Sequence, residues 1–147
     1  MKYWGKVVAP TPNPVEDALV LLKASIESGA TIAGIGQFTN LRLLDECYPG
    51  ILKTASLVLM GGHTHPPSPG FPQWDYTMDY NIQMDVRSAR YVLENSDPVI
   101  VPIGITLQTA LRRTYLNQLR NAGAVEKLIA MQAEAFAQDF HNEATYG

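Results

Sequence analysis

Three short apolar runs dominate the hydrophobic pattern of the chain. They are residues 31–36, 57–62 and 99–103, and none of them alternates polar with apolar positions. Such runs are typical of strands buried on both faces, as in a parallel sheet covered by helices. Pro102 lacks a backbone donor, which favours an edge strand or a bulge for the third run. A weaker strand is expected at residues 6–9.

Helical periodicity fills the segments between these runs. The clearest helix starts with Asn13 as N-cap and Pro14 at the first helical position, and Gly29 ends it. Its apolar residues recur every three or four positions and form one stripe. That stripe consists of Val15, Ala18, Leu19, Leu22 and Ile26.

Four further helices are predicted along the chain. One covers about 41–46, and another begins after Asp85 as N-cap and turns Val86, Ala89, Val92 and Leu93 inward. Thr106 is expected to cap a helix that reaches about Arg120, and the last helix ends near Asp139. Strands that alternate with helices predict a three-layer α/β fold with a mostly parallel sheet and flanking helices. We expect residues 1–147 to form a single, partial domain of this kind.

Length and composition indicate a globular chain and restrict the classes of molecule that it is expected to bind. The 147 residues are 46% hydrophobic and 17% charged, enough for a real core without covalent cross-links. The net charge of -3 provides no basic surface for a phosphate backbone, so no nucleic-acid partner is expected. Cys47 is the only cysteine, which suits a reducing cytoplasm. No apolar run approaches the length of a membrane span, so no membrane partner is expected.

Polar residues follow the carboxyl ends of two predicted strands, where ligands bind in open α/β sheets. Residues 36–40, GQFTN, leave the first strand. They form either a simple joint with Thr39 or Asn40 as N-cap, or a ligand site. Residues 60–62, MGG, form either a tight turn or a point where the backbone approaches a ligand closely. A long loop at 63–81, rich in proline and aromatic residues, follows and is expected to be functional.

Asp79 and Asn81 at the end of this loop suit a sugar diol. In an extended segment they point the same way, and a carboxylate and an amide together accept from and donate to hydroxyl groups. His63 and His65, with Asp75 or Asp79, are an alternative metal site. A pair of solvated loop histidines is the commoner outcome for that spacing.

Taken in order, these motifs resemble the inosine–uridine-preferring nucleoside hydrolase family. Residues 36–40 are similar to its G-P-L-T-N, residues 59–62 to its V-M-G-G, and residues 79–81 with Asp85 to its E-F-N-x-x-x-D. Residues 101–106 resemble the strand and L-D-V-T turn that follow. The resemblance covers most of this chain and the middle part of a family member.

The family hydrolyses the N-glycosidic bond of nucleosides through an oxocarbenium-like transition state. Its Ca²⁺ ion binds the ribose diol and lowers the pKa of the attacking water. For this chain the resemblance implies a calcium ligand in the Thr39 carbonyl and ribose-binding side chains in Asp79 and Asn81. Gln73 falls near the position of a further ribose-binding asparagine, and Met60 is expected to pack beside the sugar.

Departures from the family pattern change the expected activity. The resemblance starts near Pro12, and the family's D-x-D-x-G-x-D-D run, which supplies most calcium ligands and the general base, has no counterpart run of aspartates. The later His-Asp pair would fall beyond Gly147, and Asp79 replaces a glutamate. We therefore expect no catalytic residue, no tightly bound calcium and no activity of this chain alone, unless another chain completes the site.

The alternative is a non-catalytic α/β module that keeps a sugar-binding cleft and associates with itself. A sheet without its flanking strands leaves apolar surface and unpaired edges, and a twofold homodimer covers both. Residues 6–9 and a stripe of the last helix are the expected contact surfaces. The stripe consists of Leu128, Met131 and Ala135.

Overall fold

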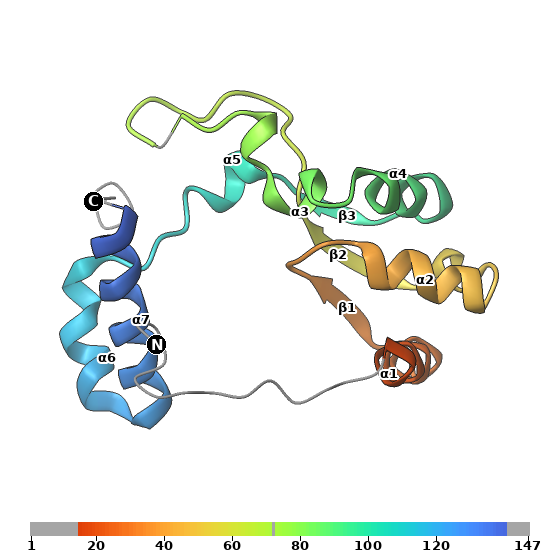
Figure 1. Cartoon of the computed structure of the whole chain (residues 1–147), viewed down its shortest axis with the longest axis horizontal. Helices are drawn as coiled ribbons and strands as arrows, with labels where there is room; N and C mark the ends of the chain where they lie inside the picture. Colours follow the sequence, from red (N-terminus) through yellow and green to blue (C-terminus); the bar gives the residue numbers. More distant parts are fainter. Residues whose placement is uncertain (1–14, 72, 141–147) are drawn as a thin grey trace. The chain divides into compact units, whose positions relative to one another are not determined.

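The computed structural model describes residues 15–71 and 73–140 (Figure 1). The chain divides into two compact units. Of the described residues, those from 15 to 108 belong to one unit and those from 109 to 140 to the other. The single domain over residues 1–147 stays a prediction, and the strand expected at residues 6–9 lies outside the described residues.

The larger unit contains a parallel sheet of three strands. These are β1 (Thr31–Gly34), β2 (Ser56–Met60) and β3 (Val99–Val101), hydrogen-bonded in the order β1-β2-β3. The α/β class, the parallel pairing and the neighbouring positions of the three apolar runs are thus confirmed. The third strand is shorter than predicted because the chain leaves the sheet before Pro102, which becomes the N-cap of a short helix.

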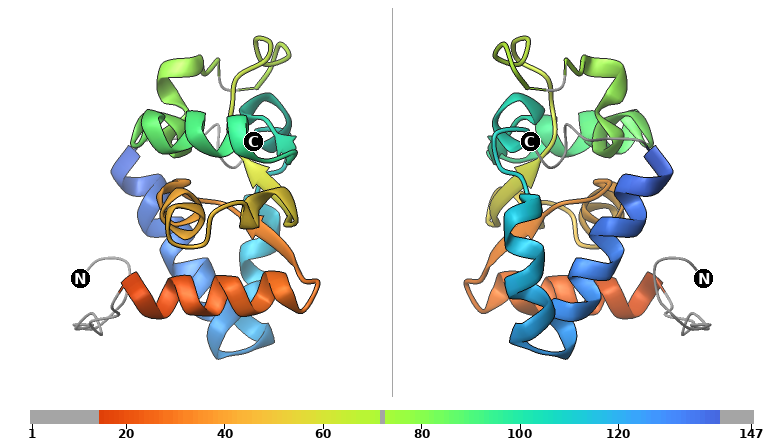
Figure 2. Two further views of the ribbon diagram at one scale, coloured as in Figure 1. Left: turned by 90° about the vertical axis from the view of Figure 1, so that its right-hand side faces the viewer. Right: turned by 90° about the vertical axis from the view of Figure 1, so that its left-hand side faces the viewer.

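Helices pack against one face of this sheet: α1, α2 and α4 lie to one side of the strands in Figure 1 and in front of them in the left view of Figure 2. The expectation that the strands are buried on both faces is therefore corrected, since burial alternates along β2 and only its Leu57 and Leu59 are buried. The helices of this unit are α1 (Val15–Glu27), α2 (Thr39–Cys47), α3 (Tyr80–Gln83), α4 (Val86–Asn95) and α5 (Ile103–Thr106), with 3₁₀ turns η1 (Ile51–Lys53) and η2 (Tyr76–Met78). None of the helices in residues 15–71 and 73–140 combines the length and the apolar character needed to cross a membrane.

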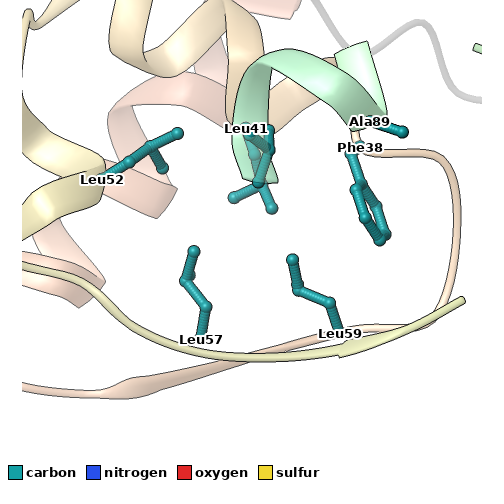
Figure 3. Packing of buried hydrophobic residues seen from close by; sticks show 7 residues of the cluster. Phe38, Leu41, Leu52, Leu57, Leu59 and Ala89 are labelled. Carbon is teal, nitrogen blue, oxygen red and sulfur yellow. The ribbon is translucent and has the colours of Figure 1, made fainter. Parts of the chain in front are cut away.

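Leucines of β2 form the centre of the core. Leu57 and Leu59 point from the strand toward α2, and Leu59 is fully buried (Figure 3). The cluster around them consists of Phe38, Leu41, Leu52, Ala89 and Val92. A second cluster attaches α1 to α2 through Leu19, Ile26 and Leu44. These clusters attach the strands to the helices. The packing fixes the carboxyl ends of the strands and so positions the loops that follow them.

Two helix predictions need correction. Val86 and Leu93 of α4 were expected to face inward but are about half exposed, because the inward stripe is narrower and holds Ala89 and Val92. Thr106 does not cap a long helix. It is the last residue of α5, and its hydroxyl donates to the Ile103 carbonyl at 3.1 Å. Helical structure starts earlier than predicted because Pro102, fixed in an extended conformation, begins the turn.

The smaller unit is a helical hairpin. It consists of the 3₁₀ turn η3 (Arg113–Tyr115), α6 (Leu116–Ala122) and α7 (Ala124–Phe140). Gly123 separates the two helices. Buried Leu116 and Ala130 hold them together.

Candidate functional site

A pocket of about 310 Å³ lies where β1 leads into α2. The residues that line it come from two segments far apart in the sequence. They are Gly36, Gln37, Thr39 and Asn40 from the first segment, and Tyr80 and Asn81 from the second. Both segments follow the carboxyl ends of neighbouring parallel strands, which is where open α/β sheets bind ligands. The two sequence motifs, residues 36–40 and 79–81, therefore both contribute residues to this pocket.

Asn81 is held from behind by Met60. The side-chain nitrogen of Asn81 donates to the backbone carbonyl of Met60 at 3.0 Å and lies 2.9 Å from the Met60 sulfur. Met60 ends β2, so this pair ties α3 directly to the sheet. Met60 is not among the residues that line the pocket.

Thr39 is held by Asp85 on the neighbouring helix. Its hydroxyl donates to the Asp85 carboxylate at 2.5 Å, and the Ser88 amide and hydroxyl donate to the same carboxylate at 3.0 and 2.6 Å. The Ser88 hydroxyl and then the Thr39 hydroxyl lower the pKa of Asp85 to about 2, so it is ionised at neutral pH. Asp85 is the predicted N-cap of α4. Thr39 is not an N-cap, because α2 starts one residue earlier with Phe38 in that position.

Asp79 turns toward the backbone. It is only 2% exposed, and its carboxylate accepts from the Gly62 amide and, at 3.2 Å, from the Ile82 amide. It thereby caps α3 and joins the two ends of the long loop. The expectation that Asp79 and Asn81 lie in one extended segment is wrong, because the chain turns into a helix after Asp79. Asp79 does not line the pocket.

Gln73 stays within the long loop. It is exposed, and its side-chain nitrogen donates to the carbonyls of Ser68 and Phe71 at 3.2 and 2.9 Å. Of the predicted site residues, the structure therefore brings Thr39 and Asn81 to one pocket with Met60 behind Asn81. Gln73 is not among the lining residues. Tyr80, which the sequence reasoning passed over, lines the pocket from inside the E-F-N-like motif.

The loop histidines do not complete the alternative metal site. His65 contacts the Thr64 hydroxyl at 2.8 Å, and His63 has a buried ring nitrogen without a partner. In the part of the chain that the structure describes, no three His, Cys, Asp or Glu residues form a group able to hold a metal ion.

The described residues do not fit the family's calcium ion. Ca²⁺ takes six to eight oxygen ligands. The Thr39 carbonyl, in the first turn of α2, would supply one of these oxygens. The two carboxylates next to the pocket, those of Asp79 and Asp85, are already bonded to protein donors.

Comparison with known proteins identifies the family of the chain. The family model for the inosine–uridine-preferring nucleoside hydrolases matches residues 5–146. The chain belongs to this family. It is 24% identical over 135 residues to the pyrimidine-specific ribonucleoside hydrolase RihA of Enterobacter sp. (strain 638), covering 90% of this chain and 41% of that protein.

Solved structures of the family share its fold. The purine-preferring ribonucleoside hydrolase from Gardnerella vaginalis superposes with a TM-score of 0.73 at 22% identity, covering 96% of this chain and 46% of that one. A plant nucleoside hydrolase superposes with a TM-score of 0.66 at 21% identity, covering 95% and 43%. The chain thus spans less than half the length of these relatives.

The family match extends closer to the N-terminus than the motifs indicated. It begins at residue 5 and so includes residues 10–17, PTPNPVED. These eight positions have the length of the family's D-x-D-x-G-x-D-D pattern. When the two are superposed, Glu16 and Asp17 fall on the last two acidic positions, whereas Pro10 and Pro12 stand at the first two aspartates. Because prolines stand at the first two aspartate positions, the sequence indicates this correspondence only through Glu16 and Asp17, which lie at the start of an apolar helix.

Proposed function

We propose that residues 15–108 form the ribose-binding part of a nucleoside hydrolase site and that the protein serves the hydrolysis of the N-glycosidic bond of ribonucleosides. The observation behind this proposal is the convergence of Thr39 and Asn81 on one pocket at the carboxyl edge of the sheet. A hydroxyl and an amide at this edge suit a sugar diol. Membership of the nucleoside hydrolase family supports the same ligand.

We propose that this chain does not catalyse the hydrolysis by itself. A water nucleophile needs a general base or a metal ion to activate it. Asp79 is occupied by two backbone amides, and Asp85 by Thr39 and Ser88, so neither carboxylate is free for that role. Pro10 and Pro12 carry no ligand atoms in their side chains. We therefore propose that another chain completes the site, and a cytoplasmic location is part of this proposal.

Binding of the sugar tests the proposal directly. In saturation-transfer NMR, the chain is expected to transfer magnetisation to D-ribose, and Asn81→Ala is expected to weaken that binding about tenfold, because a ligand hydrogen bond in the pocket is lost. Asn117→Ala, an exposed amide on α6, is the matched control and should bind ribose like the wild type. Equal ribose signals from the wild type and Asn81→Ala would contradict the proposal.

The second candidate function is a self-associating, non-catalytic module. An exposed apolar stripe of two residues, one turn apart on α7, favours it: Val125 is 66% exposed and Ile129 is 43% exposed. The predicted stripe is corrected in part, because Ala135 is buried. Among the described strands, β1 and β3 each pair on one side only, and a second copy would cover these edges as well.

Light scattering over a concentration series tests whether the chain forms a dimer or stays a monomer. The wild type is expected to approach twice the monomer mass as concentration rises. Ile129→Glu places a charge in the stripe and should shift the chain back to a monomer, since an unpaired charge is costly to bury. Leu21→Glu, at an exposed apolar position on α1, is the control. A monomer mass at every concentration would rule the dimer out.

A further inference from the structure

The two oxygens of the Asp85 carboxylate have different partners. Oδ1 accepts from the backbone amide of Ser88 at 3.0 Å, and this bond caps α4. Oδ2 accepts from the Ser88 hydroxyl at 2.6 Å and from the Thr39 hydroxyl at 2.5 Å. An N-cap needs only one side-chain oxygen. The bond between Oδ2 and Thr39 is therefore an addition to the cap, and it connects α4 to the first residue of α2.

Ser88 holds this second oxygen in place from within the protein. Ser88 is 0% exposed, and its hydroxyl donates to Oδ2 of Asp85 and accepts from Nε of Arg42 at 2.7 Å. The Arg42 guanidinium is fixed in turn by the Glu46 carboxylate, one turn further along α2, at 2.6 Å. A buried hydroxyl with a partner on each side has little freedom to rotate. Thr39 therefore meets an oxygen whose position is set by side chains of both helices.

The hydroxyl bond of Thr39 decides how this residue lines the pocket. A threonine side chain on a helix divides between two χ1 rotamers, which place its hydroxyl and its methyl group differently. The bond to Asp85 selects the rotamer that directs the hydroxyl to α4, and the methyl group then has a fixed place as well. Thr39 lines the pocket and Asp85 does not. The shape of the pocket on this side therefore depends on a residue behind its wall.

We propose that Asp85 is a positioning residue of the pocket: one carboxylate oxygen caps α4, and the other fixes the Thr39 side chain in a single rotamer before a ligand binds. This inference rests on the proposed function, in which the pocket takes a sugar. If Thr39 divided evenly between two rotamers and only one of them fitted the ligand, the apparent affinity would fall about twofold, because half of the molecules would be competent to bind. The bond to Asp85 removes that loss.

Two variants separate the two roles of Asp85. Serine is as good an N-cap as aspartate and glycine is nearly as good, but neither has a second oxygen for Thr39. Asp85→Ser and Asp85→Gly are therefore expected to keep α4 and to free Thr39. Asp85→Asn is the rescue variant, because its oxygen can cap the helix while its NH₂ group donates to the Thr39 hydroxyl, which also accepts. Asp75→Ser is the control, since Asp75 accepts from the Thr77 amide and hydroxyl in the same way at an exposed turn.

Three-bond NMR couplings of the Thr39 methyl carbon measure its rotamer without any ligand. In ¹³C,¹⁵N-labelled protein, the couplings of Cγ2 to the backbone nitrogen and carbonyl carbon are expected to show one χ1 rotamer in the wild type, in Asp85→Asn and in Asp75→Ser. In Asp85→Ser and Asp85→Gly they should move about halfway to the values of a second rotamer. Circular dichroism checks that each variant is folded. Averaged couplings in the wild type, or wild-type couplings in a folded Asp85→Ser or Asp85→Gly, overturn the proposal.

Titration with D-ribose connects the rotamer to binding. The wild type, Asp85→Asn and Asp75→Ser are expected to bind D-ribose equally, and Asp85→Ser should bind it about twofold more weakly. Wild-type affinity in Asp85→Ser, with averaged Thr39 couplings, overturns the role of Asp85 in the pocket. If the wild type does not bind D-ribose, the proposed function fails, and the couplings alone decide whether Asp85 fixes the Thr39 side chain.

Discussion

Replacement of Asp79 by asparagine is expected to lower the free energy of unfolding by about 2–4 kcal/mol, because a partly buried backbone amide loses a charged acceptor and meets an NH₂ group instead. The carboxylate now accepts from the Gly62 and Ile82 amides with its two oxygens. Asparagine has only one oxygen, so one of these bonds must break. Urea unfolding followed by circular dichroism measures the loss.

Asp75→Asn is a matched control for this change. Asp75 also caps a turn, accepting from the Thr77 amide at 2.8 Å, but it is exposed. Water can replace the lost bond there, so a loss below about 1 kcal/mol is expected. Equal losses in the two variants would show that the buried bond to Gly62 has no special importance.

The chain alone is expected to release no measurable ribose from inosine or uridine and to bind Ca²⁺ no more tightly than millimolar. The described carboxylates next to the pocket are engaged with protein donors, and the part of the chain that the structure describes does not assemble the six to eight oxygens that calcium requires. A reducing-sugar assay measures turnover, and calorimetric titration measures calcium binding.

Turnover that survives repurification and disappears in Asn81→Ala would contradict this expectation. Asn117→Ala again serves as the control, because it lies outside the pocket. Calcium binding at micromolar concentrations would contradict it independently, since it would require oxygen ligands beyond those that residues 15–71 and 73–140 bring together.

The strands were predictable because each is an uninterrupted apolar run. Leu57 and Leu59 lie in the run expected to pack on both sides, and they form the centre of the core. The end of β3 was less certain, since Pro102 allowed an edge, a bulge or a stop. Thr39 and Asn81 were reached through their motifs, which follow strand ends and so meet in any parallel sheet of this order.

The role of Asp79 could not be read from the sequence. A carboxylate before Tyr-Asn-Ile-Gln can face a ligand or cap a helical turn, and the choice depends on the backbone of those four residues. The position of Gln73 depends on the course of a long loop, for which spacing in the sequence is a poor guide. The contact between the Asn81 amide and Met60 forms only when α3 and the end of β2 are both in place, and the sequence does not show this.

The bond between the Asp79 carboxylate and the Gly62 amide has a consequence for how this protein can evolve. It fixes both ends of the segment at 63–78 at the rim of the sheet. When the ends of a loop are fixed, each doubling of its length costs only about 0.6 kcal/mol of closure entropy. Insertions in this segment can therefore accumulate while Thr39 and Asn81 keep their places. Descendants of this sequence can thus vary the length of this segment with little loss of stability.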